Sequence, residues 1–492
     1  MESLARAANR GSVSTGYDID YSLKFEPDNT EYMRRSTGTD GNQRVFTQSM
    51  WIKRTELEYS YATFWCVGNV ALRFDSSDRL EVWCYTYDGT GAGTSNTDSY
   101  RIYTAEKFQD TSAWYHVVFA LDTTQGTESN RLKVYVNNKR VYHDPNAGND
   151  IYDQTITQNS YTRCNGTGNS SENWNQIGWF YTGNYVFAGY IAEVNFVDGL
   201  QLSPTDVAEY DEDSGIWKPK EYTGAYGTNG YYLKFDDASD LGKDSSGNDN
   251  DMNSIGNIAA ADQATDTPTN NFCIGNALVN YQGLDGGGQT LSEGSTKFTN
   301  PSGQNWQSIT GTFGLTSGKW YWEFKTNGTG AFVGISDVQD DMIPQRTDGY
   351  FIGYGDDNSA TTKSLGMYST NGVIYNDAGS VAGASYSSSN IVGVALDMDN
   401  RKIHFAVDNT WAGSSDPANN TNGATWNTSW SDTVHPVFSC AQNNNVEVNY
   451  GGFTNISISS AASDANGYGT FEYAPPSGYY ALCTKNLAEY GG

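Results

Sequence analysis

The sequence predicts an all-β protein, in which two tandem antiparallel β-sandwiches follow a short N-terminal arm. The composition is the first observation behind this prediction, because 53 Gly, 35 Tyr and only 17% charged residues are typical of many short strands joined by turns. The second is a period of two in the apolar pattern, which indicates strands with one face toward a core. The third is the length of 492 residues, which exceeds what one hydrophobic core usually supports.

The acidic character of the chain limits its partners. Its 57 acidic residues against 29 basic ones give a formal net charge of −28. Such a surface repels phosphate backbones and anionic lipid headgroups, so we expect no nucleic-acid partner. The N-terminal sequence carries Glu2 and has no apolar stretch long enough for a signal peptide, and no segment approaches the length of a membrane span. We therefore expect a protein made in soluble form, with no membrane insertion.

The cysteines are expected to be buried free thiols. They lie far apart with no CxxC pair, and most of them occur inside apolar, strand-like runs. A disulfide framework is the alternative. The six residues are Cys66, Cys84, Cys164, Cys273, Cys440 and Cys483.

Residues 1–21 are predicted to form an N-terminal attachment arm. Glu2, Arg6 and Arg10 fall at i, i+4 spacing on a short helix that runs into the sequence GSVSTG. We expect this arm to pack against its own domain or against a partner, and the sequence leaves that choice open.

The first sandwich is predicted over residues 22–236. Its pattern begins at 23–25, where Leu and Phe face one way and Lys the other. A hairpin is predicted over 72–84, around the turn sequence SSD. The nearly continuous apolar run 114–121 is expected of a central strand covered on both faces. A further hairpin is predicted over 132–141, where two Asn residues tolerate the positive φ of a turn.

A series of segments then resembles a known family. WYHVVFALD is followed by KVYVNNKRV, an Ile-Gly strand, FAGYIAEV and a Leu-Ser turn. This order resembles laminin-G-like, concanavalin-type sandwiches over roughly residues 22–215. The resemblance implies a concanavalin-like jelly roll for the first domain.

An internal echo and a polar segment follow. Residues 21–26 return as residues 231–236, which fits two adjacent edge strands of one sandwich or the start of a second laminin-G-like unit. Residues 237–269 are predicted to be a linker or extra strands. Their run DSSGNDND suits a surface turn better than a cation site, so we expect no cofactor, and calcium has no further support. Pro268 favours extended chain before it, which places the domain junction there.

The second sandwich is predicted over residues 270–492. Residues 319–324 alternate aromatic and polar faces, and the strand AFVGISD can pair with them. The hairpin from 391–397 through the turn MDNRK to 403–407 is the strongest strand prediction in the chain.

Six segments of this half occur in a recognisable order: GKWYWEF, VGISD, GYFIGYGDD, VGVALDMDNRKIHFAVDN, HPVFSC and VEVNYG. The series resembles the SPRY family, over roughly residues 270–485. SPRY domains of animal proteins bind peptides through loops on one face. The usual companion domains of those proteins are missing here, so the resemblance implies the fold without implying a peptide target.

The segments that flank the second sandwich, NNFCIGN and FEYAPPSGYYALCTKNL, also resemble parts of structural, fibre-type proteins of tailed phages, especially marine ones. The arm RAANRGSVSTGYDIDYSLKFE does so too. The resemblance implies a virion protein that is made in the host cytoplasm, exposed on the particle surface and joined to other virion proteins through its arm.

No catalytic motif is present, so we expect a protein that is not an enzyme. Concanavalin-type glucanases carry a strand resembling Glu-x-Asp-x-x-Glu, and the nearest segment here, residues 209–214, ends in Ser and lies in a predicted turn. His116 and His404 lie within strands and are interpreted as structural. No histidine has metal-ligand spacing, and no nucleophile elbow, Walker loop or dinucleotide fingerprint occurs.

The sequence between Trp411 and Trp430 is the first candidate glycan site. Sugar rings stack on aromatic faces while their hydroxyls take hydrogen bonds. This segment holds Trp411, Trp426 and Trp430 in a long polar connection that includes Asn420. The alternative is that the tryptophans plug the end of the sandwich.

Two weaker candidate sites complete the prediction. Trp179 and Tyr181 offer aromatic rings in the first sandwich, but they continue directly into a strand pattern. Asp356 and Asp357 lie in a polar loop of the second sandwich, which suits a plain turn equally well.

Three functions fit these observations. The first is a tail-fibre-like or adhesin-like virion surface protein whose lectin-like sandwiches bind host surface glycans. The second is a purely structural head-fibre, decoration or tail-adaptor protein that contacts other virion proteins. The third is a glycan-degrading enzyme. A homo-oligomer is left open, because no heptad or collagen-like repeat supports one.

Overall fold

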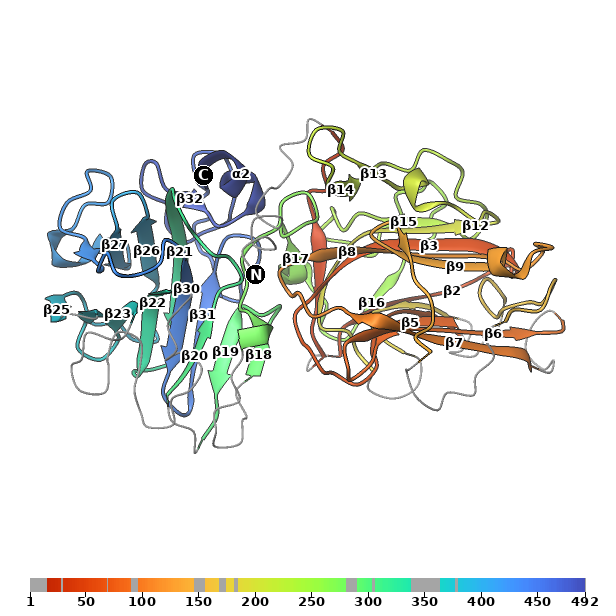
Figure 1. Ribbon diagram of the computed structural model, residues 1–492, viewed down its shortest axis with the longest axis horizontal. Coiled ribbons are helices and arrows are strands. Elements are labelled where there is room, and N and C mark those ends of the chain that lie inside the picture. Colours follow the sequence, from red (N-terminus) through yellow and green to blue (C-terminus); the bar gives the residue numbers. More distant parts are fainter. Residues whose placement is uncertain are drawn as a thin grey trace. The chain divides into compact units, whose positions relative to one another are not determined.

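The structure is a computed structural model that divides into two compact units, Ser14–Thr269 and Asn270–Gly492. Both units are β-sandwiches (Figure 1), which confirms the predicted all-β fold class. The structure describes residues 16–491 except for 28–29, 69, 90–95, 146–154, 168–173, 181–184, 280–289, 303–305, 338–362 and 377–378, and omits the side chains of 96–98 and 379.

The first unit has two main sheets, named here the β12 sheet and the β6 sheet. The β12 sheet runs in the spatial order β10 (Lys139–Arg140), β9 (Leu132–Val136), β8 (Trp114–Asp122), β3 (Val45–Arg54), β12 (Gly189–Asp198), β1 (Ser22–Phe25) and β17 (Gln263–Ala264), with β15 (Tyr231–Leu233) also on β12. The β6 sheet runs in the order β16 (Asn253–Ile255), β2 (Tyr32–Ser36), β11 (Trp174–Ile177), β4 (Ala62–Val67), β5 (Val70–Phe74), β6 (Arg79–Tyr87) and β7 (Asn96–Lys107). A separate hairpin joins β13 (Ala208–Tyr210) to β14 (Trp217–Pro219).

The second unit also has two sheets, the β26 sheet and the β22 sheet. The β26 sheet runs in the order β18 (Thr290–Ser292), β19 (Lys297–Asn300), β31 (Asn444–Asn449), β21 (Lys319–Thr326), β26 (Val392–Asp397), β27 (Lys402–Val407) and β28 (Thr410–Trp411), with β29 (Ala424–Thr425) on β27 and β32 (Tyr480–Ala481) on β21. The β22 sheet runs in the order β20 (Gln307–Thr310), β30 (Val434–Cys440), β22 (Ala331–Asp337), β23 (Ser364–Tyr368), β24 (Val373–Asn376) and β25 (Gly379–Ala382). The helix α2 (Thr484–Tyr490) follows β32.

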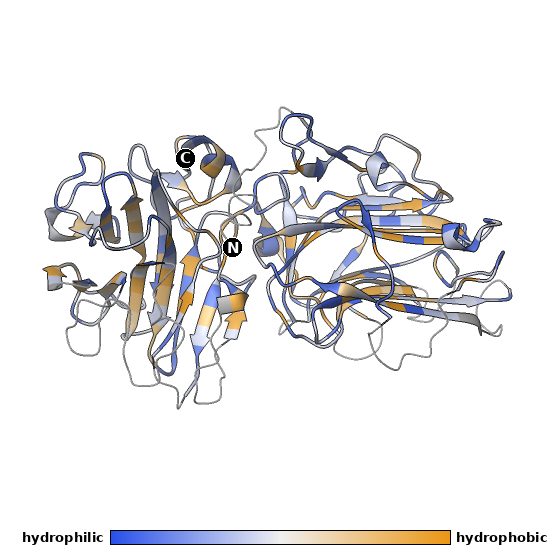
Figure 2. Cartoon of the chain, in the orientation of Figure 1, coloured by the Kyte–Doolittle hydropathy of each residue, from blue (hydrophilic) through white to orange (hydrophobic). Residues whose placement is uncertain are grey.

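The core of the first unit lies between its sheets, and it forms because successive side chains of a strand point to opposite faces. In the predicted 72–84 hairpin, Leu72 pairs with Val82, and both side chains are buried in this core. Arg73 and Glu81, one position along, meet on the other face of the β6 sheet. The hairpin prediction is confirmed, and Figure 2 shows the resulting bands of apolar residues on the strands.

β8 is the predicted central strand. It lies between β3 and β9, and Val117, Phe119 and Leu121 point into the core. On its other face, Val118 and Ala120 pack in a second apolar cluster. Both faces of β8 are therefore covered, which confirms why its sequence is apolar throughout.

β12 explains the internal echo in the sequence. Leu23 of β1 pairs with Ile191 of β12, and Tyr232 of β15 pairs with Asn195 farther along the same strand. The two echoed segments therefore belong to one sheet of one sandwich, and not to a second laminin-G-like unit. A bulge separates the two pairings, and Glu193 adopts a φ of 53° there.

Residues 237–269 add strands to the first unit, because β16 pairs with β2 and β17 pairs with β1. A buried ion pair fastens this segment to the sheet. The Lys53 ammonium lies 2.7 Å from the Asp266 carboxylate, and the side chains are 0% and 1% exposed. The Trp114 indole donates to the other carboxylate oxygen at 3.1 Å. A second buried pair, Lys24 with Asp262, joins β1 to the same segment at 2.9 Å.

The second unit forms its core in the same way. The predicted hairpin is confirmed as β26 and β27, where Val394 pairs with Phe405 and both side chains are buried. Glu323 lies on the other face of β21, fully buried. Its carboxylate accepts hydrogen bonds from the backbone N–H of Glu472 and Tyr473 at 2.9 and 2.8 Å. Burial raises the pKa of this carboxyl in spite of those donors.

The described cysteines are buried free thiols, as predicted. Cys66, Cys84 and Cys440 lie in strands and the other three in connections, and each packs as a small apolar residue. Among the helices that the structure describes, none has the length and apolar character that crossing a membrane requires.

Candidate functional site

The first candidate site, between Trp411 and Trp430, does not present three aromatic faces. Trp426 and Trp430 are only 5% and 3% exposed, and their rings lie 6.0 Å apart in the core of the second unit. Trp411 is half-buried and meets His404 edge to face. The glycan-site prediction is therefore wrong for Trp426 and Trp430, because the polar connection that carries them turns back into the core. They plug the end of the sandwich, as the alternative expected.

Some polar groups of this connection have partners and others do not. The Lys402 ammonium donates to the backbone carbonyl of Asn420 at 2.5 Å, and Asn420 itself adopts a φ of 54°. Asn419 donates to Asp416 at 2.7 Å. Asn420 is half-buried, and its side-chain oxygen, like the Ser415 hydroxyl, is buried without a hydrogen-bond partner among the described residues.

The other predicted candidates fare differently. Trp179 is half-buried and stacks on Tyr32 with ring centroids 4.5 Å apart, so one of its two faces is occupied. Tyr181, Asp356 and Asp357 lie outside the described residues.

A cleft that the sequence did not predict lies at one end of the first sandwich. It has a volume of about 550 Å³, within the range of small-ligand sites. Four loops form it, namely those that follow β2 and β12 and those that precede β11 and β15. The lining residues are Asp40, Gly41, Asn42, Gln43, Arg44, Tyr161, Asp198, Gly199, Gly227 and Thr228.

Asp198, at the end of β12, fixes three of these loops with one carboxylate. One oxygen accepts from the backbone N–H of Asn42 at 2.8 Å and from the Asn165 amide at 3.0 Å. The other oxygen accepts from the backbone N–H of Asn229 at 3.1 Å. The wall of the cleft is therefore preorganised, since any movement of one loop breaks hydrogen bonds to the others.

Tyr161 and Arg44 supply a stacking surface in the cleft. The Arg44 guanidinium lies over the Tyr161 ring, 5.0 Å from its centroid. Both side chains are half-buried. Within the described part of the chain, the Arg44 side chain makes no hydrogen bond or ion pair, so its donors face the cleft unpaired.

Asp40 and Asn42 add polar groups of both kinds. One Asp40 oxygen accepts from the backbone and the hydroxyl of Thr167, and these bonds hold the pKa of the carboxyl below its usual range. The side-chain amide oxygen of Asn42 accepts hydrogen bonds from the backbone N–H groups of Arg44 and Val45. The second Asp40 oxygen and the Asn42 amide nitrogen are exposed and accessible to a ligand that carries both donors and acceptors.

Glycine is the sequence feature that could have indicated this cleft. A Cβ on Gly41 would lie 2.6 Å from Asp198, and one on Gly227, where φ is 75°, would lie 2.2 Å from the Asp198 carbonyl. Gly41 stands in the sequence Asp-Gly-Asn at 40–42, and a further Asp-Gly of the cleft lies at 198–199. Such dipeptides mark turns, but nothing in the sequence tells which turns meet.

One pair in the first unit resembles a nucleophile with its base but has the wrong proton arrangement. Ser49 Oγ lies 2.9 Å from His116 Nε2, and the Trp217 indole donates to His116 Nδ1 at 3.1 Å. Because an indole can only donate, Nδ1 accepts and the ring proton resides on Nε2. His116 therefore donates to Ser49 and cannot take its proton, and burial lowers the pKa of the ring to about 3.

The side chains that could bind a metal ion do not cluster in the described part of the chain. Among the described residues, no group of three or more His, Cys, Asp and Glu side chains gathers as a metal ion would need. The run DSSGNDND forms a turn in which Asp244 accepts from the backbone N–H of Tyr232, Ser246 and Asn250.

Glu193, at the β12 bulge, joins the arm to the first unit. The Tyr17 hydroxyl donates to its carboxylate at 2.8 Å, and the Tyr232 hydroxyl does so at 2.9 Å. The two hydroxyls also contact each other. Burial raises the pKa of Glu193 to about 7, although the hydrogen bonds from Tyr17 and Tyr232 lower it. The described part of the arm thus packs against its own unit through a titratable group.

This arrangement predicts a pH-dependent stability of the first unit. A carboxyl with a raised pKa stabilises the folded state fully below its unfolded value of about 4.3, and that contribution is lost as the pH rises through about 7. The free energy of unfolding of the first unit is therefore expected to be lower at pH 8 than at pH 5, measured by urea unfolding with hydrogen exchange in β3 and β8. Glu193→Gln should reduce this difference, and an unchanged difference in Glu193→Gln would show that another group is responsible.

Comparison with known families identifies one domain of the chain. Residues 319–453, within the second unit, match the family model described as the SPRY domain. This match confirms the SPRY part of the resemblance, whereas the laminin-G-like part stays a prediction. No curated protein matches the chain.

Solved structures resemble parts of the chain at low identity. The SPRY domain of human HERC1 is 16% identical, with a TM-score of 0.25, over 34% of this chain and 94% of its own. The PSpry domain of TRIM65 is 14% identical, with a TM-score of 0.27, over 36% and 91%. A Bacteroides ovatus protein provisionally described as carbohydrate-binding is 16% identical, with a TM-score of 0.33, over 49% and 59%.

Proposed function

We propose that this chain is a virion surface protein of a tailed phage, tail-fibre-like or adhesin-like, that binds a host surface glycan without catalytic activity. Two resemblances in the sequence support the viral part, namely the arm before residue 27 and the segments that flank the SPRY domain. On this proposal the arm contacts other virion proteins, and the sandwiches are exposed on the particle.

The cleft at the end of the first sandwich carries the glycan-binding part of the proposal. A saccharide offers a flat apolar ring face and hydroxyls that both donate and accept. Tyr161 supplies an aromatic face, Arg44 and Asn42 supply donors, and Asp40 supplies an acceptor. The carboxylate of Asp198 is occupied by the loops that it holds, so its role is positioning.

Tyr161→Ala is expected to weaken glycan binding about fivefold, because it removes a stacking contact of about 1 kcal/mol. The measurement is the affinity of the full chain for the best ligand of a host-polysaccharide array. Tyr142→Ala is the matched control, since Tyr142 is also covered by an arginine, Arg140 at 5.4 Å, but is 66% exposed and lies outside the cleft. Equal affinities of the two variants would disprove the cleft as the binding site.

A phage adsorption assay distinguishes the receptor-binding function from the purely structural alternative. If the chain is a receptor-binding protein, the purified chain should compete with phage attachment to host cells, and Tyr161→Ala should compete less well. A chain that neither binds cells nor competes would be the head-fibre, decoration or adaptor protein of the alternative. Release of reducing sugar from host polysaccharide is expected to stay at background, and release above it would indicate an enzyme instead.

A further inference from the structure

The outer face of the β6 sheet carries a row of side chains that is unusual for this chain. Neighbours in register run across six strands, from β2 through β11, β4, β5 and β6 to β7. They all point away from the core, because each stands directly opposite the next. The row consists of Arg34, Gln176, Cys66, Ala71, Trp83 and Arg101.

At each end of the row, the guanidinium group of an arginine lies over the ring of a tryptophan. The Arg34 guanidinium lies 4.1 Å from the centroid of Trp174, and the Arg101 guanidinium lies 6.0 Å from that of Trp83. These four side chains are half-buried. Phe180 covers the small residues in the middle of the row and stacks on Trp83 at 5.3 Å, so two arginine–tryptophan patches flank it.

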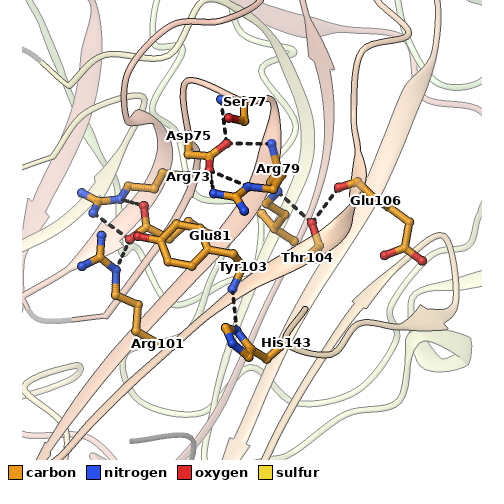
Figure 3. A network of polar contacts seen from close by, with 11 residues as sticks. Arg73, Asp75, Ser77, Arg79, Glu81, Arg101, Tyr103, Thr104, Glu106 and His143 are labelled. Carbon is orange, nitrogen blue, oxygen red and sulfur yellow. Dashed lines mark hydrogen bonds and ion pairs between the residues drawn. The ribbon is translucent and has the colours of Figure 1, made fainter. Parts of the chain in front are cut away.

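Positive charge is in excess on this face. Arg73 approaches Glu81 with two nitrogens, at 2.7 and 2.8 Å, and Arg101 binds the same carboxylate from β7 (Figure 3). One carboxylate therefore serves two guanidinium groups. Within the described part of the chain, the side chain of Arg34 makes no ion pair or hydrogen bond. A chain of net charge −28 thus keeps a local excess of cations on one sheet face.

The unpartnered polar atoms of the row are all donors. Gln176 Nε2 and Trp83 Nε1 are buried and have no acceptor among the described residues. A buried donor without an acceptor costs about 1–3 kcal/mol. Because both of these atoms are buried, the half-buried Arg34 guanidinium is the donor of the row that a bound anion can reach.

We infer that this face binds an acidic polysaccharide, with its carboxylate or sulfate groups on the arginines and its sugar rings against the tryptophans. Guanidinium groups bind such anions in a two-pronged geometry. Strands lie about 4.8 Å apart, so the two ends of the row, five strands apart, are roughly 24 Å from each other. That separation suits a polymer that reaches both patches. The row shares no residue with the cleft lining, so this inference does not rest on the proposed function.

A polysaccharide fits better than a nucleic acid. Nucleic-acid affinity depends on many phosphate contacts, and the overall charge of −28 opposes a continuous phosphate backbone. Isolated arginines on aromatic rings match anions that are spaced along a chain of sugar rings.

The test measures binding of the full chain to polygalacturonate, dextran sulfate and uncharged dextran, at about 50 mM and about 300 mM NaCl. At least one polyanion should bind, less tightly at high salt, and dextran should not. Arg34→Gln is expected to weaken polyanion binding about tenfold or more. Arg401→Gln, which removes the same charge from the second unit, where Arg401 pairs with exposed Asp432, should have little effect. The polyanion that binds identifies carboxylate or sulfate as the anion.

Two further variants guard against a folding defect. Arg34→Lys keeps the charge but not the two-pronged geometry and should bind with intermediate affinity. Trp83→Phe keeps the stack on Phe180 but gives Arg101 a weaker aromatic partner, and it should also bind less tightly. Equal losses in Arg34→Gln and Arg401→Gln, no binding of either polyanion, or tighter binding of single-stranded DNA through Arg34 would each overturn the inference. None of these outcomes bears on glycan binding in the cleft, which Tyr161→Ala tests separately.

Discussion

Asp266→Ala is expected to destabilise the first unit by about 3–5 kcal/mol, because it removes a counter-charge that lies directly against the buried Lys53 ammonium. The pair lies at 2.7 Å with both side chains essentially inaccessible, and Asp266 also accepts from Trp114. Urea unfolding of the full chain, followed by hydrogen exchange in β3 and β8, reports the first unit. Exchange in β26 provides an internal reference.

A control variant and a compensating double variant test this prediction further. Asp237→Ala removes an acid from the same segment, but its pair with Lys243 is exposed, so no measurable shift in unfolding is expected. Lys53→Met combined with Asp266→Leu should recover most of the loss, since an apolar pair of similar volume leaves no buried charge. If Asp266→Ala and Asp237→Ala unfold at the same urea concentration, the buried pair does not hold residues 237–269 to the sandwich.

Glu323→Gln is expected to cost the second unit about 3 kcal/mol or more. The carboxylate accepts from two backbone N–H groups, from the Tyr321 hydroxyl and from the Asn449 amide. A glutamine offers one accepting oxygen and turns an amide N–H₂ toward the remaining donors, which leaves buried donors without acceptors.

Glu447→Gln is the matched control for this variant. Glu447 lies on the neighbouring strand β31, opposite Lys325, and its side chain is 17% exposed beside Lys297. Loss of that partly exposed ion pair should shift unfolding only slightly. The readout is hydrogen exchange in β21 and β26 during urea unfolding, and similar shifts in the two variants would contradict the role assigned to Glu323.

The fold was predictable from the sequence because its strands are amphipathic and its turns carry their own residues. The period of two in β5 and β6 and in β26 and β27 places apolar side chains in the cores. Buried β8 was recognisable because both of its faces are apolar. The pairing of β1 and β15 with the same strand, β12, left only an echo between β1 and β15 in the sequence, since register between distant strands depends on the whole sheet.

The site was much less predictable. Trp426 and Trp430 lie in a stretch rich in Asn, Thr and Gly, and the sequence shows no apolar partners nearby, although their partners come from distant strands of the core. The cleft was unpredictable for a different reason, because each turn that forms it has an ordinary turn sequence. Only the carboxylate of Asp198 brings them together, and no local pattern predicts such a contact.

The pairing of β1 with β17 has a consequence for synthesis on the ribosome. Leu23 pairs with Gln263, so β1 emerges about 240 residues before its neighbour. At roughly 5–20 residues per second, that delay lasts roughly 12–50 s. During this time the outer edge of β1 lacks its last neighbour and is exposed to other nascent chains. Chaperones should therefore decide the yield of this chain more than its final stability does.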